Sequence, residues 1–344
     1  MTILLIGSVE LASSIAYRKL FGQWSHNYYM NLNRFMFRSH PYLVGALIEG
    51  AEHERDGLLY SHNSLGCRGA KFGKKKTNGK IRVVAMGGST TYGVGVNNEE
   101  TWPFHLSEYL GAEYEVVNLG VPGYSSVENL IQTALHLSDL QPDIAIYYIG
   151  LNDLRNVNVK DLKADYSDFH APSLYGALGL CPNENIPSLA MLKIALIMAQ
   201  RIGILEGCPN QEIHTTGNEH NGIDQRALSL YERNLKNIAS LCRTQGIKVI
   251  FVPHVLLEEV LQTGNYNWWI PYIPNSEMDD MMRAYNSKLG EVSAASEIIF
   301  ADKVLQQEWM KDDFVDMSHF NDSSNQKLAE ILSVYVKDMS EQEK

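Results

Sequence analysis

The sequence has few cysteines and fewer basic than acidic residues. Four cysteines occur in 344 residues, and neither a Cys-x-x-Cys pair nor a cysteine–histidine spacing typical of tetrahedral zinc is present. Lys and Arg total 29 against 40 Asp and Glu, which gives a formal net charge of −11. Because nucleic-acid binding is driven by clustered basic side chains, this balance argues against a nucleic-acid partner. We therefore expect no metal, no cofactor and no nucleic acid.

Long apolar runs are also missing. The apolar stretch over residues 3–16 contains Glu10 and is shorter than the roughly 20 residues that a membrane-spanning helix needs. It also lacks the positive flank that precedes the apolar part of a signal peptide. Two interpretations stay open, namely an amphipathic helix that caps the domain, or the end of a longer signal anchor if Met1 is not the natural start.

Two further features have structural interpretations. Cys181 and Cys208 bracket one segment, and they would form a disulfide only in an exported protein. The one basic run, residues 71–80, is short and contains glycine. We interpret it as a solvated linker ahead of the first core strand.

The pattern of the chain changes at Ile81. Residues 1–80 show no sustained period and are interpreted as an N-terminal extension. Beyond them, short Val- and Ile-rich runs alternate with helical stretches, which is the pattern of βαβ units. Five runs mostly lack polar alternation, as expected for strands covered on both faces. They are residues 81–86, 115–119, 143–149, 248–252 and 298–301.

The predicted fold class is α/β, with a central parallel five-stranded sheet in a three-layer α/β/α arrangement over residues 81–344. Capping residues mark the helices between the strands. Ser125 and Glu128 form a capping box, Asp224 opens a helix that ends at Gly246, and Ser276 opens a third. Right-handed crossovers place such helices on both faces of the sheet.

One stretch does not fit the repeat. Residues 156–221 contain Pro, Gly and both bracketing cysteines. They are too long for a bare loop in a compact domain, so we expect an inserted subdomain near the site. Within it, residues 190–204 form an apolar segment that is predicted to be helical.

Four loops stand where an open α/β sheet binds its ligands, beyond the carboxyl ends of the strands. They cover residues 87–93, 120–125, 150–153 and 316–319. Each has a structural explanation when taken alone. Gly-Gly-Ser is a common tight turn and helix cap, Asn152 suits a turn, and Asp-x-x-His is often a surface pair.

The first loop does not fit two other well-known motifs. A phosphate-binding GxxxxGK[ST] loop needs a Lys that is absent, and the spacing of GxGxxG is absent too. In the GxSxG elbow of α/β-hydrolases a glycine follows two residues after the serine, whereas Thr91 stands there.

The four loops together predict nucleophilic catalysis. A serine such as Ser89 needs a base, and the base needs a third group that fixes its tautomer. Asp316 and His319 are three residues apart and can meet that need on one helical turn. The backbone N–H groups of Ser89 and Gly123 and the amide of Asn152 can donate hydrogen bonds to a tetrahedral intermediate.

These residues resemble the SGNH hydrolase superfamily, also called GDSL-like lipases and acylhydrolases. The resemblance spans residues 82–336 and depends on GGSTTYG, NLGVPGYSS, PDIAIYYIGLND and DMSH. It implies Ser89 as nucleophile, Gly123 and Asn152 as oxyanion donors, and Asp316 with His319 as the acid–base pair. The first block departs from Gly-Asp-Ser-Leu but keeps the serine. The closest likeness is to bacterial members with an N-terminal segment, and NSLGCRG at residues 63–69 is similar to a segment of that group.

The resemblance implies a flavodoxin-like sheet and a serine esterase, with the acetyl ester of a carbohydrate or a small molecule as expected substrate. Two alternatives remain, an O-acyltransferase acting on a glycan and a non-catalytic glycan-binding module. Many members with such an N-terminal segment carry a membrane anchor. Membrane association through the N-terminus, outside the cytoplasm, is therefore favoured over a cytoplasmic location.

An aromatic segment follows the fourth predicted strand and thus lies at the same edge as Ser89. It contains Trp268 and Trp269 between glycine and prolines. One interpretation is a loop whose aromatic rings cover the core. The other is a platform or lid that binds the acyl-bearing group, since rigid amphipathic rings suit such sites.

Overall fold

The computed structural model describes most of the chain and divides it into two compact units. Described residues are 2–21, 36–38, 40, 43–55, 57–69, 71–159, 162–166, 190–201, 222–263, 270 and 273–341. One unit comprises Met1–Ile48 with Asp165–Glu212, and the other Glu49–Ala164 with Ile213–Lys344.

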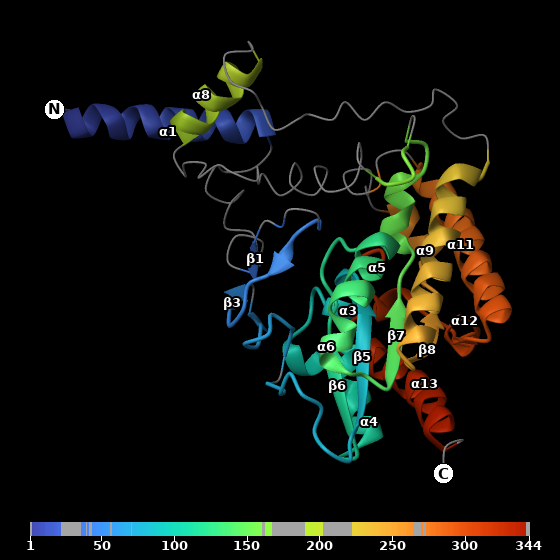
Figure 1. The fold of residues 1–344 in the computed structure, drawn as a ribbon. Helices are drawn as coiled ribbons and strands as arrows, with labels where there is room; N and C mark the ends of the chain where they lie inside the picture. The colour runs from blue at the N-terminus through green and yellow to red at the C-terminus, as the bar shows by residue number, and fades with distance from the viewer. Residues whose placement is uncertain are drawn as a thin grey trace. The chain divides into compact units, whose positions relative to one another are not determined.

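The first unit contains a pair of helices and a short hairpin. Helix α1 (Thr2–Phe21) packs against α8 (Ala190–Arg201), which confirms the helix predicted within residues 190–204 (Figure 1). Strands β1 (Phe37–Arg38) and β2 (Ala46–Leu47) pair antiparallel. The Glu10 carboxylate accepts the backbone N–H groups of Ala190 at 2.6 Å and Met191 at 3.1 Å. The acidic residue of the apolar run therefore caps the amino end of α8, where negative charge is favourable.

A search of the described residues finds no helix with the length and apolar character that crossing a membrane requires.

A parallel sheet forms the centre of the second unit, as predicted. Its five strands are β5 (Ile81–Gly87), β6 (Tyr114–Asn118), β7 (Ile144–Tyr148), β8 (Lys248–Val252) and β9 (Ile299–Phe300). Their order is β6-β5-β7-β8-β9, with every neighbouring pair parallel. All five strands therefore end at one edge, which gathers the loops that follow them.

Helices cover both faces of the sheet, which gives the predicted three layers. On one face α4 (Trp102–Leu110) packs against α13 (Asp322–Glu341). The other face carries α5 (Ser126–Leu135), α9 (Gln225–Thr244) and α11 (Asn275–Ser296) (Figure 1). Tyr147 of β7 points to this second layer, because its hydroxyl lies 2.7 Å from Thr133 Oγ1 and 3.4 Å from Cys242 Sγ.

The capping chemistry largely agrees with the sequence. Ser125 and Glu128 form the predicted capping box of α5, and Asp224 caps α9. The prediction for Ser276 was wrong, because α11 begins at Asn275 with Pro274 at the cap position. The fixed φ of proline is compatible with the start of a helix, so α11 begins directly after Pro274 and one residue before Ser276.

The residues before the sheet are more regular than the sequence indicated. Strands β3 (Glu52–Arg55) and β4 (Leu58–Ser61) form an antiparallel hairpin within the second unit. The turn that follows is closed by Asn63, whose Oδ1 accepts the N–H groups of Leu65 at 2.9 Å and Cys67 at 3.1 Å. Strands of four residues are too short for their period to stand out, so this part of the expected irregular extension is corrected.

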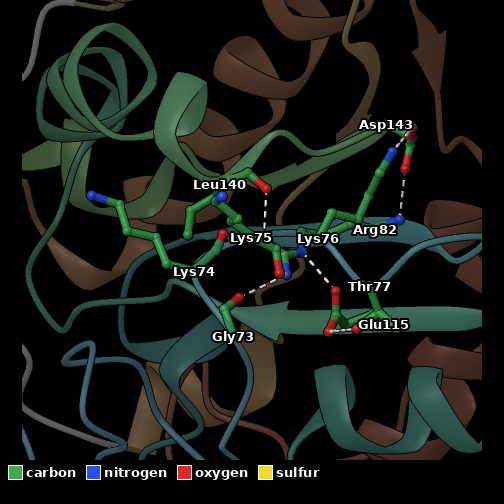
Figure 2. Close-up of polar contacts among 9 residues, drawn as sticks. All are labelled: Gly73, Lys74, Lys75, Lys76, Thr77, Arg82, Glu115, Leu140 and Asp143. Atoms are coloured by element: carbon green, nitrogen blue, oxygen red, sulfur yellow. Dashed lines mark hydrogen bonds and ion pairs between the residues drawn. The ribbon is translucent and has the colours of Figure 1, made fainter.

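The basic run ahead of β5 is a largely exposed linker without helix or strand, as predicted, and its main chain is anchored to the sheet. Buried Arg82 binds Glu115 at 2.7 Å and donates to the main-chain carbonyls of the run (Figure 2). These carbonyls belong to Gly73, Lys74 and Lys75. Lys76 reaches Asp143 at 2.6 Å. Because Arg82 and Asp143 stand where β5 and β7 begin, this anchor lies at the amino-terminal edge of the sheet, opposite the four predicted loops.

Candidate active site

Ser89 begins a short helical turn directly after the first core strand. β5 ends at Gly87, Gly88 is the cap, and α3 spans Ser89–Tyr92. A side chain at Gly87 would lie 2.3 Å from Thr91 Oγ1 and 2.5 Å from the carbonyl oxygen of Tyr148. Only glycine fits there, so the strand can turn sharply and leave the half-buried Ser89 at the carboxyl edge of the sheet.

Asn152 and the Gly123 turn adjoin the Ser89 turn. Gly123 is buried with φ at +85°, a backbone conformation that favours glycine. The Asn152 amide donates to the carbonyl oxygen of Tyr124 at 2.9 Å. A Cβ atom at Gly88 would lie 2.6 Å from Nδ2 of Asn152 and 3.1 Å from the Tyr124 oxygen. Three loops that the sequence placed at one edge therefore meet around the residue before Ser89.

Asp316 and His319 form a hydrogen-bonded pair. Nδ1 of His319 lies 2.6 Å from Oδ2 of Asp316, while Oδ1 accepts the backbone N–H groups of Ser318 and His319, each at 3.0 Å. Burial alone would raise the pKa of Asp316, but the charge of His319 and these hydrogen bonds lower it to about 2. The carboxylate therefore stays ionised beside the ring.

The pair does not lie on a helical turn, which corrects the expectation from its spacing. Residues 315–318 form a bend between η3 (Lys311–Asp313) and α13. An antiparallel bridge between Phe314 and Phe320 closes the bend, and the Val315 N–H donates to the His319 carbonyl at 2.8 Å. A spacing of three residues fits a closed bend as well as a helix.

The other ring nitrogen of His319 is buried. Within the described part of the chain, Nε2 has no hydrogen-bond partner, and no hydrogen bond joins it to Ser89. The segments that carry Ser89 and His319 nevertheless adjoin. A Cβ at Gly95, just after the Ser89 turn, would lie 2.8 Å from Cγ2 of Val315, which is in the bend that contains Asp316. Bonds between a nucleophile and its base are often long before substrate binds, so this geometry is compatible with a proton transfer.

Sequence reasoning missed His254, a buried histidine. It follows β8 at the same edge, and its ring stacks on Tyr148 with centroids 4.6 Å apart. Asn286 holds its backbone through bonds of 2.9 and 2.8 Å, and its Nδ1 lies 3.2 Å from the Val255 carbonyl oxygen. Burial, and to a lesser extent the charge of His319, lower the pKa of His254 to about 3. Its place after a core strand was the signal that could have found it.

Sequence reasoning also missed the part that Arg68 plays at the site. Its guanidinium is buried between two tyrosine rings, with Cζ 4.5 Å from the ring centroid of Tyr60 and 4.6 Å from that of Tyr92. Burial lowers the pKa of Arg68. It donates to Tyr92 O at 2.8 Å, to Gly93 O, to Val96 O at 2.5 Å and to Asn98 Oδ1 at 2.9 Å. The signal was the NSLGCRG segment, in which this arginine stands. Arg68 thus holds the carboxyl end of the turn that Ser89 begins.

Some predictions fall on residues that the structure does not describe. Trp268 and Trp269 lie outside the described residues, as do Cys181 and Cys208. The other two cysteines, Cys67 and Cys242, are buried free thiols, and burial raises the pKa of Cys67 to about 12. Thiols of this kind are poor nucleophiles.

The sheet order and the four loops define an SGNH-type α/β protein. Residues 85–327 match the sequence profile of the GDSL-like Lipase/Acylhydrolase family, and the chain belongs to this family of serine hydrolases. This confirms the resemblance drawn from the motifs. Comparison with curated proteins found no match.

Several solved structures are similar at low identity. One is a GDSL-like lipase from Bacteroides thetaiotaomicron, with 13% identity over 78% of this chain and 92% of that chain, at a TM-score of 0.44. Another is a catalytic mutant of an acetylxylan esterase from Geobacillus stearothermophilus, with 12% identity over 75% of this chain and 94% of that chain, at a TM-score of 0.41.

Proposed function

We propose that the protein is a serine esterase that hydrolyses a carboxylic ester through an acyl-enzyme intermediate. The observation that carries the proposal is the His319–Asp316 pair, in which Nδ1 lies 2.6 Å from the carboxylate and Nε2 of His319 is buried. The segment that carries this pair adjoins the end of the Ser89 turn. Family membership supports the same chemistry. An acetyl ester of a carbohydrate or a small molecule is the substrate we propose.

Each residue has a role in this proposal. Neutral His319 takes the proton of Ser89 as the hydroxyl oxygen attacks the ester carbonyl, and Asp316 stabilises the imidazolium that forms. The backbone N–H groups of Ser89 and Gly123 and the Asn152 amide donate to the oxyanion. His319 then protonates the leaving alcohol, and it activates a water molecule that releases the carboxylic acid from Ser89.

The test is covalent labelling combined with hydrolysis. A fluorophosphonate should label the wild-type chain at Ser89, and Ser89→Ala should lose the label. Its kcat on p-nitrophenyl acetate should fall by about 10³-fold or more, with an unchanged melting temperature. Ser229→Ala is the matched control, because that exposed hydroxyl on α9 donates only to the Arg226 carbonyl at 2.8 Å.

The products separate the remaining alternatives. With an acetylated sugar as donor, release of free acetate indicates hydrolysis, whereas transfer to a second sugar indicates an O-acyltransferase that uses the same acyl-enzyme. Wild-type protein that neither reacts with the fluorophosphonate nor cleaves any ester would instead be a non-catalytic glycan-binding module. Wild-type activity in Ser89→Ala would overturn the mechanism.

The proposal also assigns substrate binding to Trp268 and Trp269. An aromatic platform should contact a sugar ring but not the small p-nitrophenyl acetate. Replacing either tryptophan by alanine should therefore raise KM for a glycan ester far more than for p-nitrophenyl acetate. Equal effects on both substrates, or loss of folding, would favour a role in the core.

A further inference from the structure

The buried carboxylate of Asp153 connects two of the loops at the site. Asp153 follows Asn152 in η2 (Leu151–Asn156) and is 1% exposed. Its Oδ2 accepts the backbone N–H of Ser126 at 3.0 Å, and its Oδ1 accepts the Ser126 hydroxyl at 2.5 Å. Ser126 is the first residue of α5, three positions after Gly123. Both bonds therefore run from the Asn152 loop to the Gly123 loop.

The connection is buried and supported from a third element. Asn234 of α9 donates its amide to the Ser126 hydroxyl oxygen at 2.9 Å, and both residues are fully buried. The amino end of α5 favours a negative charge, so the helix and the carboxylate hold each other. The bond from the Asn152 amide to Tyr124 O, at 2.9 Å, links the same two loops a second time.

We propose that Asp153 is a positioning residue that sets the distance between the two oxyanion donors, the Gly123 N–H and the Asn152 amide. The inference rests on the proposed function of these donors. Hydrogen bonds to a carboxylate are stronger than those between neutral groups, and a bidentate pair restricts direction as well as distance. Donors stabilise an oxyanion only where they are already aimed at its position, so a stiff link between their loops promotes the reaction.

The test is Asp153→Asn in the full chain. Asparagine has the same size, but it lacks the charge and offers one acceptor oxygen in place of two. The loosened donors should lower kcat on p-nitrophenyl acetate by about 10- to 100-fold, with KM within about twofold of the wild type. The pH dependence of kcat/KM should keep its position, because Asp153 acts on the donors and not on His319.

A double-mutant cycle with Asn152→Ala separates this role from a merely structural one. If Asp153 acts through Asn152 and Gly123, adding Asp153→Asn to Asn152→Ala should lower kcat by only about threefold more, because residues that act as a unit are not additive. If Asp153→Asn instead lowered kcat independently of Asn152, the two effects would multiply. Asp224→Asn is the matched control, since Asp224 accepts the N–H groups of Arg226 and Ala227 at 2.9 and 3.1 Å at the start of α9, and that of Asn158 at 2.9 Å. It should lower the melting temperature and leave kcat unchanged.

A second variant keeps the test decisive if Asp153→Asn does not fold. Ser126→Ala removes the bond to Oδ1 and keeps the charge and the backbone bond, so a smaller fall in kcat is expected, with the same non-additivity toward Asn152→Ala. Multiplying effects, a rise in KM at constant kcat, or an unchanged kcat in both variants would overturn the inference. Full activity in Ser89→Ala would instead overturn the proposed function, so the two failures are distinguishable.

Discussion

The Asp316 carboxylate binds His319 twice. Oδ2 lies 2.6 Å from Nδ1 of the ring, and Oδ1 accepts the backbone N–H of the same residue at 3.0 Å. One carboxylate thus orients both the ring and the chain segment that carries it. Because Nδ1 carries the hydrogen of this bond, Nε2 of the neutral ring is the nitrogen that can accept a proton.

Asp316→Asn should therefore spoil catalysis with little effect on folding. An asparagine can present its amide to Nδ1 and stabilise the wrong tautomer, so kcat should fall on the order of 10³- to 10⁴-fold. The Asp316 side chain is 42% exposed, and screening by solvent should keep the loss of stability within about 1 kcal/mol. Steady-state kinetics and thermal melting measure both quantities.

The control for that variant is Asp312→Asn, in the same segment but exposed, which should match the wild type in kcat. The stabilising effect of Asp316 has a definite sign with pH. Its pKa falls from 3.8 to about 2 on folding, so the effect is present above about pH 4 and is lost as the pH drops toward 2. A kcat in Asp316→Asn close to that of the wild type would contradict the assignment.

Gly88→Ala should displace the Asn152 amide without unfolding the chain. The new Cβ would lie 2.6 Å from Asn152 Nδ2, the movable end of a side chain, and 3.1 Å from the backbone oxygen of Tyr124, where a shift of a few tenths of an ångström is enough, and φ at Gly88 is negative, at −93°. Because misplacing a donor costs nearly as much as removing it, kcat should fall by about 10²-fold.

Gly290→Ala, on α11, is the matched substitution, since its Cβ would make an ordinary contact of 3.6 Å with Phe300. It should leave kcat unchanged and raise the free energy of unfolding by up to about 1 kcal/mol. Equal activity in the two variants would mean that Gly88 does not constrain Asn152.

Arg68→Lys should destabilise the fold and slow catalysis together. Lysine keeps the positive charge, but its single ammonium group cannot replace the planar guanidinium that donates to four acceptors. Buried carbonyl groups at the end of α3 therefore lose their donors. We expect a loss of about 2–4 kcal/mol in the free energy of unfolding, measured by urea denaturation. Exposed Arg243, which donates to Ser296 O at 2.6 Å, is the control, and Arg243→Lys should change stability by less than about 0.5 kcal/mol. An Arg68→Lys variant as stable and active as the wild type would refute this role.

The sequence predicted the features whose causes are local. The runs of Val and Ile indicated the strands, and Ser125 with Glu128 indicated where α5 begins, because periodicity and capping act over a few residues. Arg68 could not be placed in this way, since three of its four acceptors are main-chain carbonyls 24 to 28 residues away, and every residue has a carbonyl. Asp153 could not be placed either, because the role proposed for it depends on Ser126, 27 positions away. Ser126 begins α5, the helix that packs against α9.

The last prediction concerns His254 and the stability of the fold at acid pH. Its pKa falls from 6.5 in the unfolded chain to about 3 in the folded one, mainly through burial, with a smaller effect of the His319 charge. Between pH 6.5 and about pH 3, His254 binds a proton in the unfolded chain but not in the folded one. The free energy of unfolding therefore rises with pH in this range, and acidification removes the stability that the neutral His254 provides. Between pH 7 and pH 5 the loss due to this residue should be about 2 kcal/mol.

His254→Asn replaces the ring with an amide that can still donate to the Val255 carbonyl but does not titrate. Urea denaturation at both pH values should show a change smaller by that amount in His254→Asn, whatever its stability at pH 7. His136→Asn, at an exposed position after α5, should keep the wild-type change. If His254→Asn and the wild type lost stability equally on acidification, His254 would have to be protonated in the folded protein, and its buried stack on Tyr148 could not be as described.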